Sequence, residues 1–304
     1  MSLNSPLVSI VIVTYNSAEF ILDMLNSAKG QTYANIELVI TDDCSSDLTC
    51  VICEEWLSVN KNNFFNTQII KTPENKGTSA NINRGLNHTN GEWVKIIAGD
   101  DYLYPSCIEE LMKEINTNPS IEILFSNLAV NGVPLEKKEI TDFFKLNNKL
   151  QYRTLLKNSF LPVPGTFIKS TTLKKLHGFD EKYILFEDFP FLLKALKSGI
   201  KFYYVDKPLV YYRIHETNLS HEQKINKNYF KDIRRFFQLE YLKELRKNGL
   251  ILHYIHYNIQ YLLLIFVTND IITNHSLYKS ILSWSSPLNW KLRIKKRLFR
   301  NIEV

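Results

Sequence analysis

Three apolar segments, each ending in polar residues, constrain the fold of this chain more than any other feature. "VSIVIVTYN" (residues 8–16) is a nearly continuous run of β-branched residues, which is typical of a strand buried on both faces. "NIELVITDD" (residues 35–43) and "GEWVKIIAGDD" (residues 91–101) have the same character, and helical patterns separate the three. The alternation predicts an α/β protein with a mostly parallel sheet and right-handed crossovers.

The polar ends of these segments are expected to meet. In open α/β sheets, ligands bind beyond the carboxyl ends of the strands, where "TYN", "TDD" and "AGDD" should converge. Asp100 and Asp101 are adjacent like charges, which raise each other's pKa unless a cation lies beside them. They form either a polar turn or part of a site for a divalent cation, because hard cations prefer carboxylate oxygens.

The first strand and its turn exclude two common nucleotide sites. The strand runs into "VTYNSAEF" without a glycine, so neither the G-x-G-x-x-G dinucleotide turn nor the G-x-x-x-x-G-K-[ST] phosphate loop is present there. Hydride transfer and P-loop ATP hydrolysis are therefore disfavoured. Tyr15 is suited to stacking on a base, and Asp43 to accepting hydrogen bonds from a base or ribose.

The cysteine content fits a protein of a reduced compartment. Its 304 residues are 45% hydrophobic, enough for a large core, and it has four cysteines and a net charge of +6. Cys50 and Cys53 have C-x-x-C spacing but lie in an amphipathic helical pattern, so we do not predict a zinc or redox site.

The start of the sequence resembles no signal peptide, and the apolar run at residues 261–267 is too short to span a bilayer. We expect a cytoplasmic protein, either soluble or peripheral on the inner face of the cytoplasmic membrane.

Six segments, in the same order along the chain, resemble the glycosyltransferases of family 2, which have the GT-A fold. They are "PLVSIVIVTYN", "QTYANIELVITDDCSSD", "ENKGTSANINRG", "AGDDYLYP", "FDEKYILFEDFPFLLKAL" and "YYRIHETNLS". Together they cover residues 6–220. The resemblance implies a Rossmann-like mixed sheet flanked by helices, with a catalytic domain at residues 1–220. The residue pattern that follows predicts a helical region at residues 221–304.

The same resemblance implies a nucleotide-sugar donor and a Mn²⁺ or Mg²⁺ cofactor. The implied donor-binding residues are Thr14, Tyr15, Asn16, Asp43, Asn75, Gly77, Asn83 and Asp100. Asp101 is the implied metal ligand, while Asp100 holds the ribose or assists the metal. Many relatives have an acid where this chain has Ala98, so the division of roles between Asp100 and Asp101 stays open.

Glycosyl transfer also needs a base, because the acceptor hydroxyl must lose its proton as it attacks. "LFEDFPFLL" offers Glu187 and Asp188 among aromatic residues that raise a carboxyl pKa and exclude water. The family assigns the base to the second acid, Asp188, which leaves Glu187 for substrate hydroxyls. Pro164 and Gly165 are expected on the acceptor side.

The loop "YRIHETNLS" is expected to close over the donor. His215 in that loop is a candidate metal ligand, or it orders the loop over the diphosphate. Arg213 would then face phosphate. The stretch at residues 131–156 is expected to determine acceptor selectivity.

The C-terminal region is rich in aromatic residues and ends in a basic segment. Its helices are expected to pack on the catalytic domain or on a second subunit of a homodimer. "NWKLRIKKRLFR" (residues 289–300) has an apolar stripe among basic residues, which favours binding to anionic lipid over a solvated tail. No nucleic-acid recognition module accompanies this charge.

The sequence therefore predicts an inverting, metal-dependent glycosyltransferase. It would move a hexose or N-acetylhexosamine, most simply from a UDP-sugar, to a glycan or a lipid-linked oligosaccharide in O-antigen or capsule synthesis. Two alternatives remain, a nucleotidyltransferase and a non-catalytic sugar-nucleotide-binding subunit.

Overall fold

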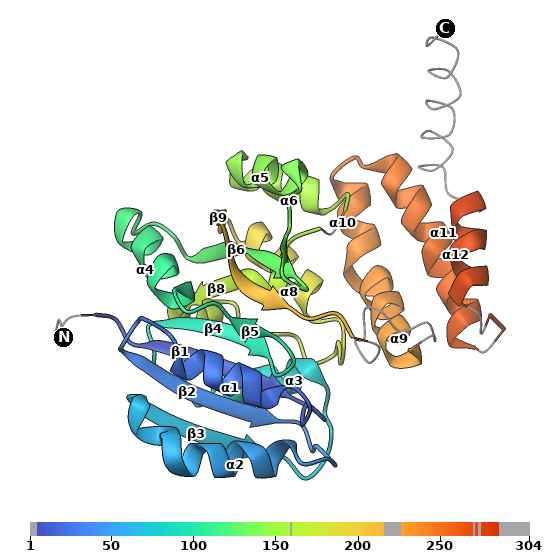
Figure 1. Ribbon diagram of the computed structural model, residues 1–304. Coiled ribbons are helices and arrows are strands. Elements are labelled where there is room, and N and C mark those ends of the chain that lie inside the picture. The colour runs from blue at the N-terminus through green and yellow to red at the C-terminus, as the bar shows by residue number, and fades with distance from the viewer. Residues whose placement is uncertain (1–4, 159, 216–225, 270, 273–274, 286–304) are drawn as a thin grey trace, which may run out of the picture. The chain divides into compact units, whose positions relative to one another are not determined.

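The structure of the 304-residue chain is a computed structural model. It describes residues 5–158, 160–215, 226–269, 271–272 and 275–285 (Figure 1). The chain forms two compact units, one of Met1–Leu155 with Ser159–Ile214 and one of Leu156–Asn158 with His215–Val304. The boundary predicted at residue 220 lies outside the described residues.

The first unit is built on one mixed sheet of nine strands. The strands are β1 (Val8–Thr14), β2 (Ile36–Asp42), β3 (Asn66–Lys71), β4 (Trp93–Ala98), β5 (Tyr102–Leu103), β6 (Ile123–Val130), β7 (Val133–Pro134), β8 (Thr166–Lys169) and β9 (Phe202–Tyr212). They are ordered β3-β2-β1-β4-β8-β6-β9-β5, with β7 paired to β6. Strands β3, β2, β1 and β4 are parallel, whereas β8 is antiparallel to both β4 and β6.

The strand register brings the predicted polar clusters to one edge. Thr14 of β1 pairs with Asp42 of β2, and Val13 pairs with Ala98 of β4. The backbone N–H of Asp43 donates to the Thr14 carbonyl at 3.0 Å, and that of Gly99 donates to the Val13 carbonyl at 3.0 Å. The predicted convergence of "TYN", "TDD" and "AGDD" is confirmed.

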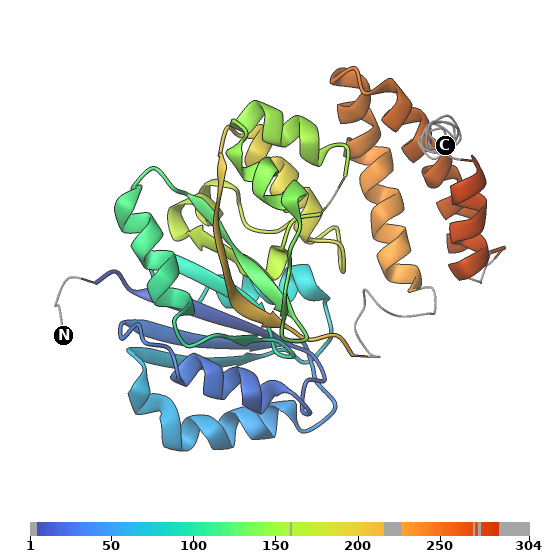
Figure 2. The ribbon, with the colours of Figure 1, turned by 45° about the horizontal axis from the view of Figure 1, so that its top comes forward.

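Helices cover both faces of this sheet (Figures 1 and 2). The main core forms where α1 (Ile21–Lys29), α2 (Thr49–Asn60) and α4 (Cys107–Thr117) bury apolar side chains with one face of β1, β2 and β4. On the other face α3 (Thr78–Leu86) packs so closely that a Cβ on its Gly85 would lie 2.7 Å from Val11 Cγ1. A 3-10 turn, η1 (Lys61–Asn63), follows α2.

The segment expected to select the acceptor, residues 131–156, contains two helices. They are α5 (Lys138–Lys145) and α6 (Asn148–Leu155). The Asn148 amide of α6 donates to the carbonyls of Leu196 and Ile200, both at 2.8 Å. It thereby fixes the end of α8 (Asp188–Lys197), the helix that begins at the predicted base. A turn, η2 (Val163–Gly165), and α7 (Ser170–Lys175) flank β8.

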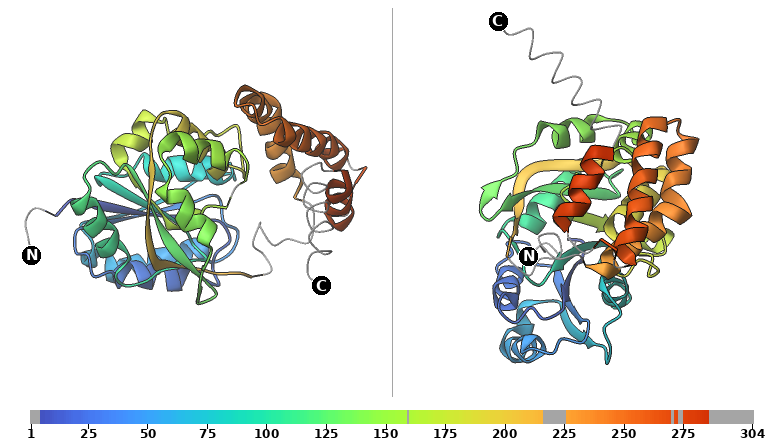
Figure 3. Two further views of the ribbon diagram at one scale, coloured as in Figure 1. Left: turned by 90° about the horizontal axis from the view of Figure 1, so that it is seen from above. Right: turned by 90° about the vertical axis from the view of Figure 1, so that its right-hand side faces the viewer.

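The second unit is helical, as predicted. It contains α9 (Lys227–Phe236), the π-helical turn η3 (Phe237–Tyr241), α10 (Leu242–Lys247), α11 (Ile251–Thr268) and α12 (His275–Ser285) (Figure 3). The short segment Leu156–Asn158 belongs to it, since the Tyr241 hydroxyl donates to the Leu156 carbonyl at 2.9 Å. By length and composition α11 could cross a bilayer, having 18 residues and a mean hydropathy of 1.2.

Candidate active site

Asp101 is held at the exit of β4 with its carboxyl group almost wholly buried. It is 2% exposed, and Oδ1 accepts a hydrogen bond from the Arg213 backbone N–H at 2.9 Å. Burial, and secondly the adjacent Asp100 charge, raises the pKa of Asp101 to about 7. The groups of this chain around Asp101 therefore stabilise its negative carboxylate form only weakly, and a cation beside it would stabilise that form.

Asp101 and Asp188 line the same pocket, together with Glu187 and Pro164. The remaining walls are mostly apolar and come from β1, α3, β4, β8 and α8. They include Val13, Thr78, Ile82, Ile97, Thr166, Ile168, Phe179, Phe191 and Leu192. Burial raises the pKa of Asp188 above its ordinary value. The structure thus brings the predicted metal ligand, the predicted base and an acceptor-side residue to one cavity.

A residue that the sequence reading missed, Lys95, supports one wall of this pocket. It lies in the middle of β4 and is fully buried. Its ammonium group donates to the carbonyls of Pro164 and of Thr166, the latter at 3.2 Å. Burial lowers the pKa of Lys95 to about 8, against the effect of nearby groups that include Asp101. A lysine inside an otherwise apolar strand, "WVKIIA", was the available signal.

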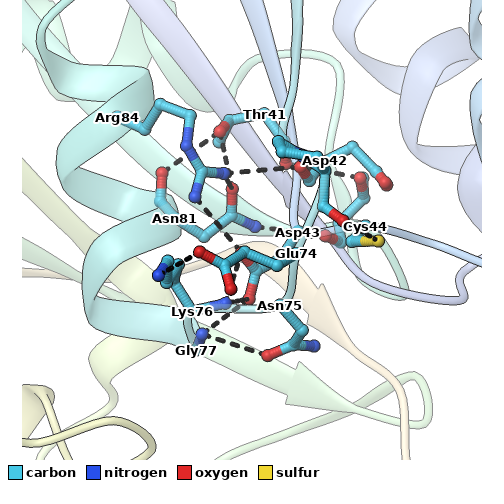
Figure 4. Close-up of polar contacts among 12 residues, drawn as sticks. Thr41, Asp42, Asp43, Cys44, Glu74, Asn75, Lys76, Gly77, Asn81 and Arg84 are labelled. Carbon is cyan, nitrogen blue, oxygen red and sulfur yellow. Dashed lines mark hydrogen bonds and ion pairs between the residues drawn. The ribbon is translucent and has the colours of Figure 1, made fainter.

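Asp43 organises the loop before α3 (Figure 4). Its carboxylate accepts hydrogen bonds from the backbone N–H of Lys76 at 3.1 Å and of Gly77 at 2.7 Å, and Arg84 lies 3.3 Å away. The Asn75 side chain also accepts from Gly77 N at 3.1 Å. Asp43 and its surrounding motif residues therefore form one cluster, and their binding of a nucleotide stays a prediction.

Helix α3 also braces the chain leading to Asp188. The Asn83 side chain exchanges two hydrogen bonds with the backbone of Phe179, at 2.8 and 2.9 Å. Ser79 donates through its hydroxyl to the Tyr183 carbonyl. At Gly77, where φ is +89°, a Cβ would lie 2.6 Å from the Ile184 carbonyl oxygen. Gly77 and Asn83, both predicted to bind the donor, thus directly contact the segment before the predicted base.

The turn after β1 presents Tyr15 to solvent. Tyr15 is 53% exposed, whereas Thr14 is buried. Asn16 has a positive φ of 51°, and its side chain accepts a hydrogen bond from the Ser46 N–H at 2.8 Å. The exposed ring is available for the predicted base stacking, while Thr14 and Asn16 make contacts within the protein.

Arg213 contacts other groups of the protein, and its predicted approach to phosphate stays a prediction. Its guanidinium group donates to the Asp100 carbonyl at 2.9 Å and pairs with Asp23 at 2.8 Å, and it lies over the Phe20 ring. His215 begins the second unit, and the rest of the predicted loop, with Asn218 and Ser220, lies outside the described residues. Metal binding by His215 stays a prediction.

The C-x-x-C pair is poorly suited to thiolate chemistry. Burial, before any charge effect, raises the pKa of both the Cys50 and Cys53 thiols to about 12. Within the part of the chain that the structure describes, no three His, Cys, Asp or Glu side chains gather as a metal site.

Comparison with known proteins is consistent with this geometry. The family model "Glycosyl transferase family 2" matches residues 9–175. The *Escherichia coli* protein named UDP-Glc:alpha-D-GlcNAc-diphosphoundecaprenol beta-1,3-glucosyltransferase WfaP is 29% identical over 70% of this chain and 80% of its own length. A putative teichuronic acid biosynthesis glycosyltransferase, TuaG of *Bacillus subtilis*, is 25% identical over 71% of this chain and 82% of its own.

Solved structures share the fold. *Staphylococcus aureus* TarS 1-349 in complex with UDP-GlcNAc has a TM-score of 0.62 and 22% identity, covering 86% of this chain and 72% of that one. Against the TarS chain of another crystal structure the TM-score is 0.60, and this chain spans 43% of it. A mannosyltransferase from *Pyrobaculum calidifontis*, in complex with GDP-Man and Mn²⁺, has a TM-score of 0.56 and covers 81% of this chain.

Proposed function

The chain belongs to glycosyl transferase family 2, and from that premise we propose an inverting, metal-dependent transfer of a hexose or N-acetylhexosamine from a UDP-sugar to a glycan. It is a glycosyltransferase with the GT-A fold. The observation that carries the proposal is that Asp101, which follows β4, and Asp188, the first residue of α8, line one pocket with mostly apolar walls.

Asp188 is suited to the proton transfer. Its raised pKa makes it a stronger base than an ordinary aspartate, and the apolar neighbours Phe191 and Leu192 limit water in the pocket. As the acceptor oxygen bonds to the anomeric carbon and the bond to the diphosphate breaks, the acceptor proton passes to Asp188 Oδ. A single displacement of this kind inverts the anomeric configuration. Glu187, on the same wall, is suited to hydrogen bonding with sugar hydroxyls.

Asp101 is suited to a divalent cation. Its carboxylate is buried and poorly compensated, and carboxylate oxygens are preferred ligands of Mg²⁺ and Mn²⁺. When bound, such a cation would offset the charge that develops on the diphosphate leaving group. Arg213 fixes the backbone of Asp100 through the Asp100 carbonyl, and we assign the Asp100 side chain to assisting the metal or contacting ribose.

The names of related proteins support the donor and acceptor classes. WfaP is named for a UDP-glucose donor and an acceptor on diphosphoundecaprenol, and TarS was solved with UDP-GlcNAc. We extend these classes to this chain, in surface polysaccharide synthesis at the cytoplasmic face of the membrane. The basic segment predicted to bind lipid lies outside the described residues.

A thermal-shift screen tests this function. UDP with Mn²⁺ should raise the melting temperature more than UDP or Mn²⁺ alone, because ligands that bind the native state stabilise it. Asp101→Ala should remove the Mn²⁺-dependent part of the shift and keep the fold, whereas Asp142→Ala, an exposed acid on α5, should keep the shift. Absence of a shift with any uridine nucleotide would refute the donor assignment, and an unchanged Mn²⁺ effect in Asp101→Ala would refute the ligand assignment.

A further inference from the structure

Helix α11 carries an apolar stripe that faces outward. At 100° per residue, six side chains fall within an arc of about 100° on one side of the helix. They are Ile251, Leu252, Ile255, Ile259, Leu262 and Phe266. Five of them are 42% to 54% exposed, and Ile259 is partly exposed. Isolated exposed apolar residues are common, but a contiguous stripe marks an interaction surface.

The polar contacts of α11 lie on its other side. Gln260 donates to the Tyr278 hydroxyl at 3.0 Å, Tyr257 donates to the Lys157 carbonyl at 3.2 Å, and Thr268 accepts from Arg234 at 2.6 Å. Leu264 and Val267, also on that side, are buried. A surface helix of a soluble domain normally turns its apolar stripe toward the core. The opposite orientation here indicates that a further apolar partner covers the stripe.

The charges of this unit indicate which partner that is. The 18 residues of α11 include no Asp, Glu, Lys or Arg. Among the described residues from 226 to 285, eight are Lys or Arg and three are Asp or Glu. The unit therefore combines an uncharged helix with a net positive charge, which favours a partner that is apolar where it meets α11 and anionic overall. An anionic lipid bilayer meets both conditions, whereas a second copy would bring a unit of the same positive charge.

We propose that α11 lies in the surface of an anionic bilayer, with its stripe from Ile251 to Phe266 inserted among the acyl chains. The helix lies parallel to the membrane and does not span it. The length of α11 would allow spanning, but a spanning helix would carry the Gln260–Tyr278 hydrogen bond, near its middle, into the hydrocarbon. In this position the second unit holds the enzyme at the surface where a lipid-linked acceptor would be presented. Only this last point rests on the proposed function.

The test is co-sedimentation of the full chain with vesicles of phosphatidylglycerol and phosphatidylcholine. The double variant Ile255→Glu, Leu262→Glu places two charges in the stripe, and vesicle affinity should fall at least about tenfold. Val59→Glu, at a 77% exposed position of α2, is the matched control and should bind like the wild type. Repeating the assay at about 0.5 M NaCl screens purely electrostatic attraction, so the remaining difference reports apolar insertion.

Three results would overturn the inference. The first is equal vesicle binding by the double variant and the wild type at both salt concentrations. The second is a wild-type protein that is dimeric in light scattering and a double variant that is monomeric but binds vesicles equally well, which would assign the stripe to contact with a second copy. The third is wild-type protein that resists alkaline carbonate extraction, which would indicate a spanning helix. UDP binding and turnover of a soluble acceptor analogue should be unchanged in the double variant, so failure of the proposed function is detected separately.

Discussion

Gly77→Ala should destabilise the protein by an amount that the structure divides into two parts. Gly77 has φ +89° and ψ 171°, a conformation open almost only to glycine, so alanine adds about 1–3 kcal/mol of backbone strain. Its Cβ would also lie 2.2 Å from Ile184 Cγ2 and 2.6 Å from the Ile184 carbonyl oxygen. Overpacking of this kind costs about 1–3 kcal/mol more. The free energy of unfolding should therefore fall by about 2–6 kcal/mol.

Gly199→Ala separates the two parts. Gly199 has φ +93°, but a Cβ there would meet nothing within 4 Å, so Gly199→Ala is destabilised by backbone strain without a steric clash. Urea denaturation should place Gly77→Ala about 1–3 kcal/mol below Gly199→Ala. Adding Ile184→Ala to Gly77→Ala should recover part of that difference, because the side-chain clash is removed while the carbonyl clash remains. Equal losses in Gly77→Ala and Gly199→Ala would refute the close contact between Gly77 and Ile184, which precedes the predicted base.

Three further outcomes are expected. Lys95→Met should lower the free energy of unfolding by about 1–3 kcal/mol, because two buried carbonyls lose their donor. It should also raise the acceptor KM more than it changes UDP affinity. An unchanged acceptor KM would show that Lys95 does not support the acceptor side of the pocket. In chelator-treated protein, burial raises the pKa of Asp101 to about 7 in the native state, whereas in the unfolded chain it is about 4. Between these two pH values the native state therefore binds one more proton than the unfolded state. Stability should therefore fall as pH rises through that window, and Asp101→Asn should flatten this dependence in denaturation at each pH. Removal of residues 290–304 should weaken binding to anionic vesicles with less effect on turnover of a soluble acceptor analogue, and equal binding would favour a solvated tail.

The strands and their shared edge were predictable because their signals are local. The β-branched runs ending at Thr14 and Asp42 fix strands by periodicity, and parallel topology then brings their ends together. The base and metal candidates came from the family resemblance, and the structure places Asp101 and Asp188 in one pocket.

The features that were missed depend on distant contacts or on unusual local chemistry. The role of Lys95 depends on its hydrogen bonds to the carbonyls of Pro164 and Thr166, about seventy positions along the chain. Strand β9 contains Pro208, which normally marks an edge or an irregularity, and the register with β6 shifts beside it. Hydropathy alone also cannot tell which side of α11 packs inward, because the apolar stripe is equally visible in the sequence whichever way it faces.

The most direct test of the mechanism is Asp188→Asn, compared with Glu187→Gln. Asparagine keeps the shape of the side chain but cannot accept the acceptor proton, so transfer should fall at least ~10²-fold while UDP-sugar affinity stays near normal. Glu187→Gln should lose less. The anomeric configuration of the wild-type product, read from NMR coupling constants, should be opposite to that of the donor. A retained configuration, or full transfer activity in Asp188→Asn, would contradict the account.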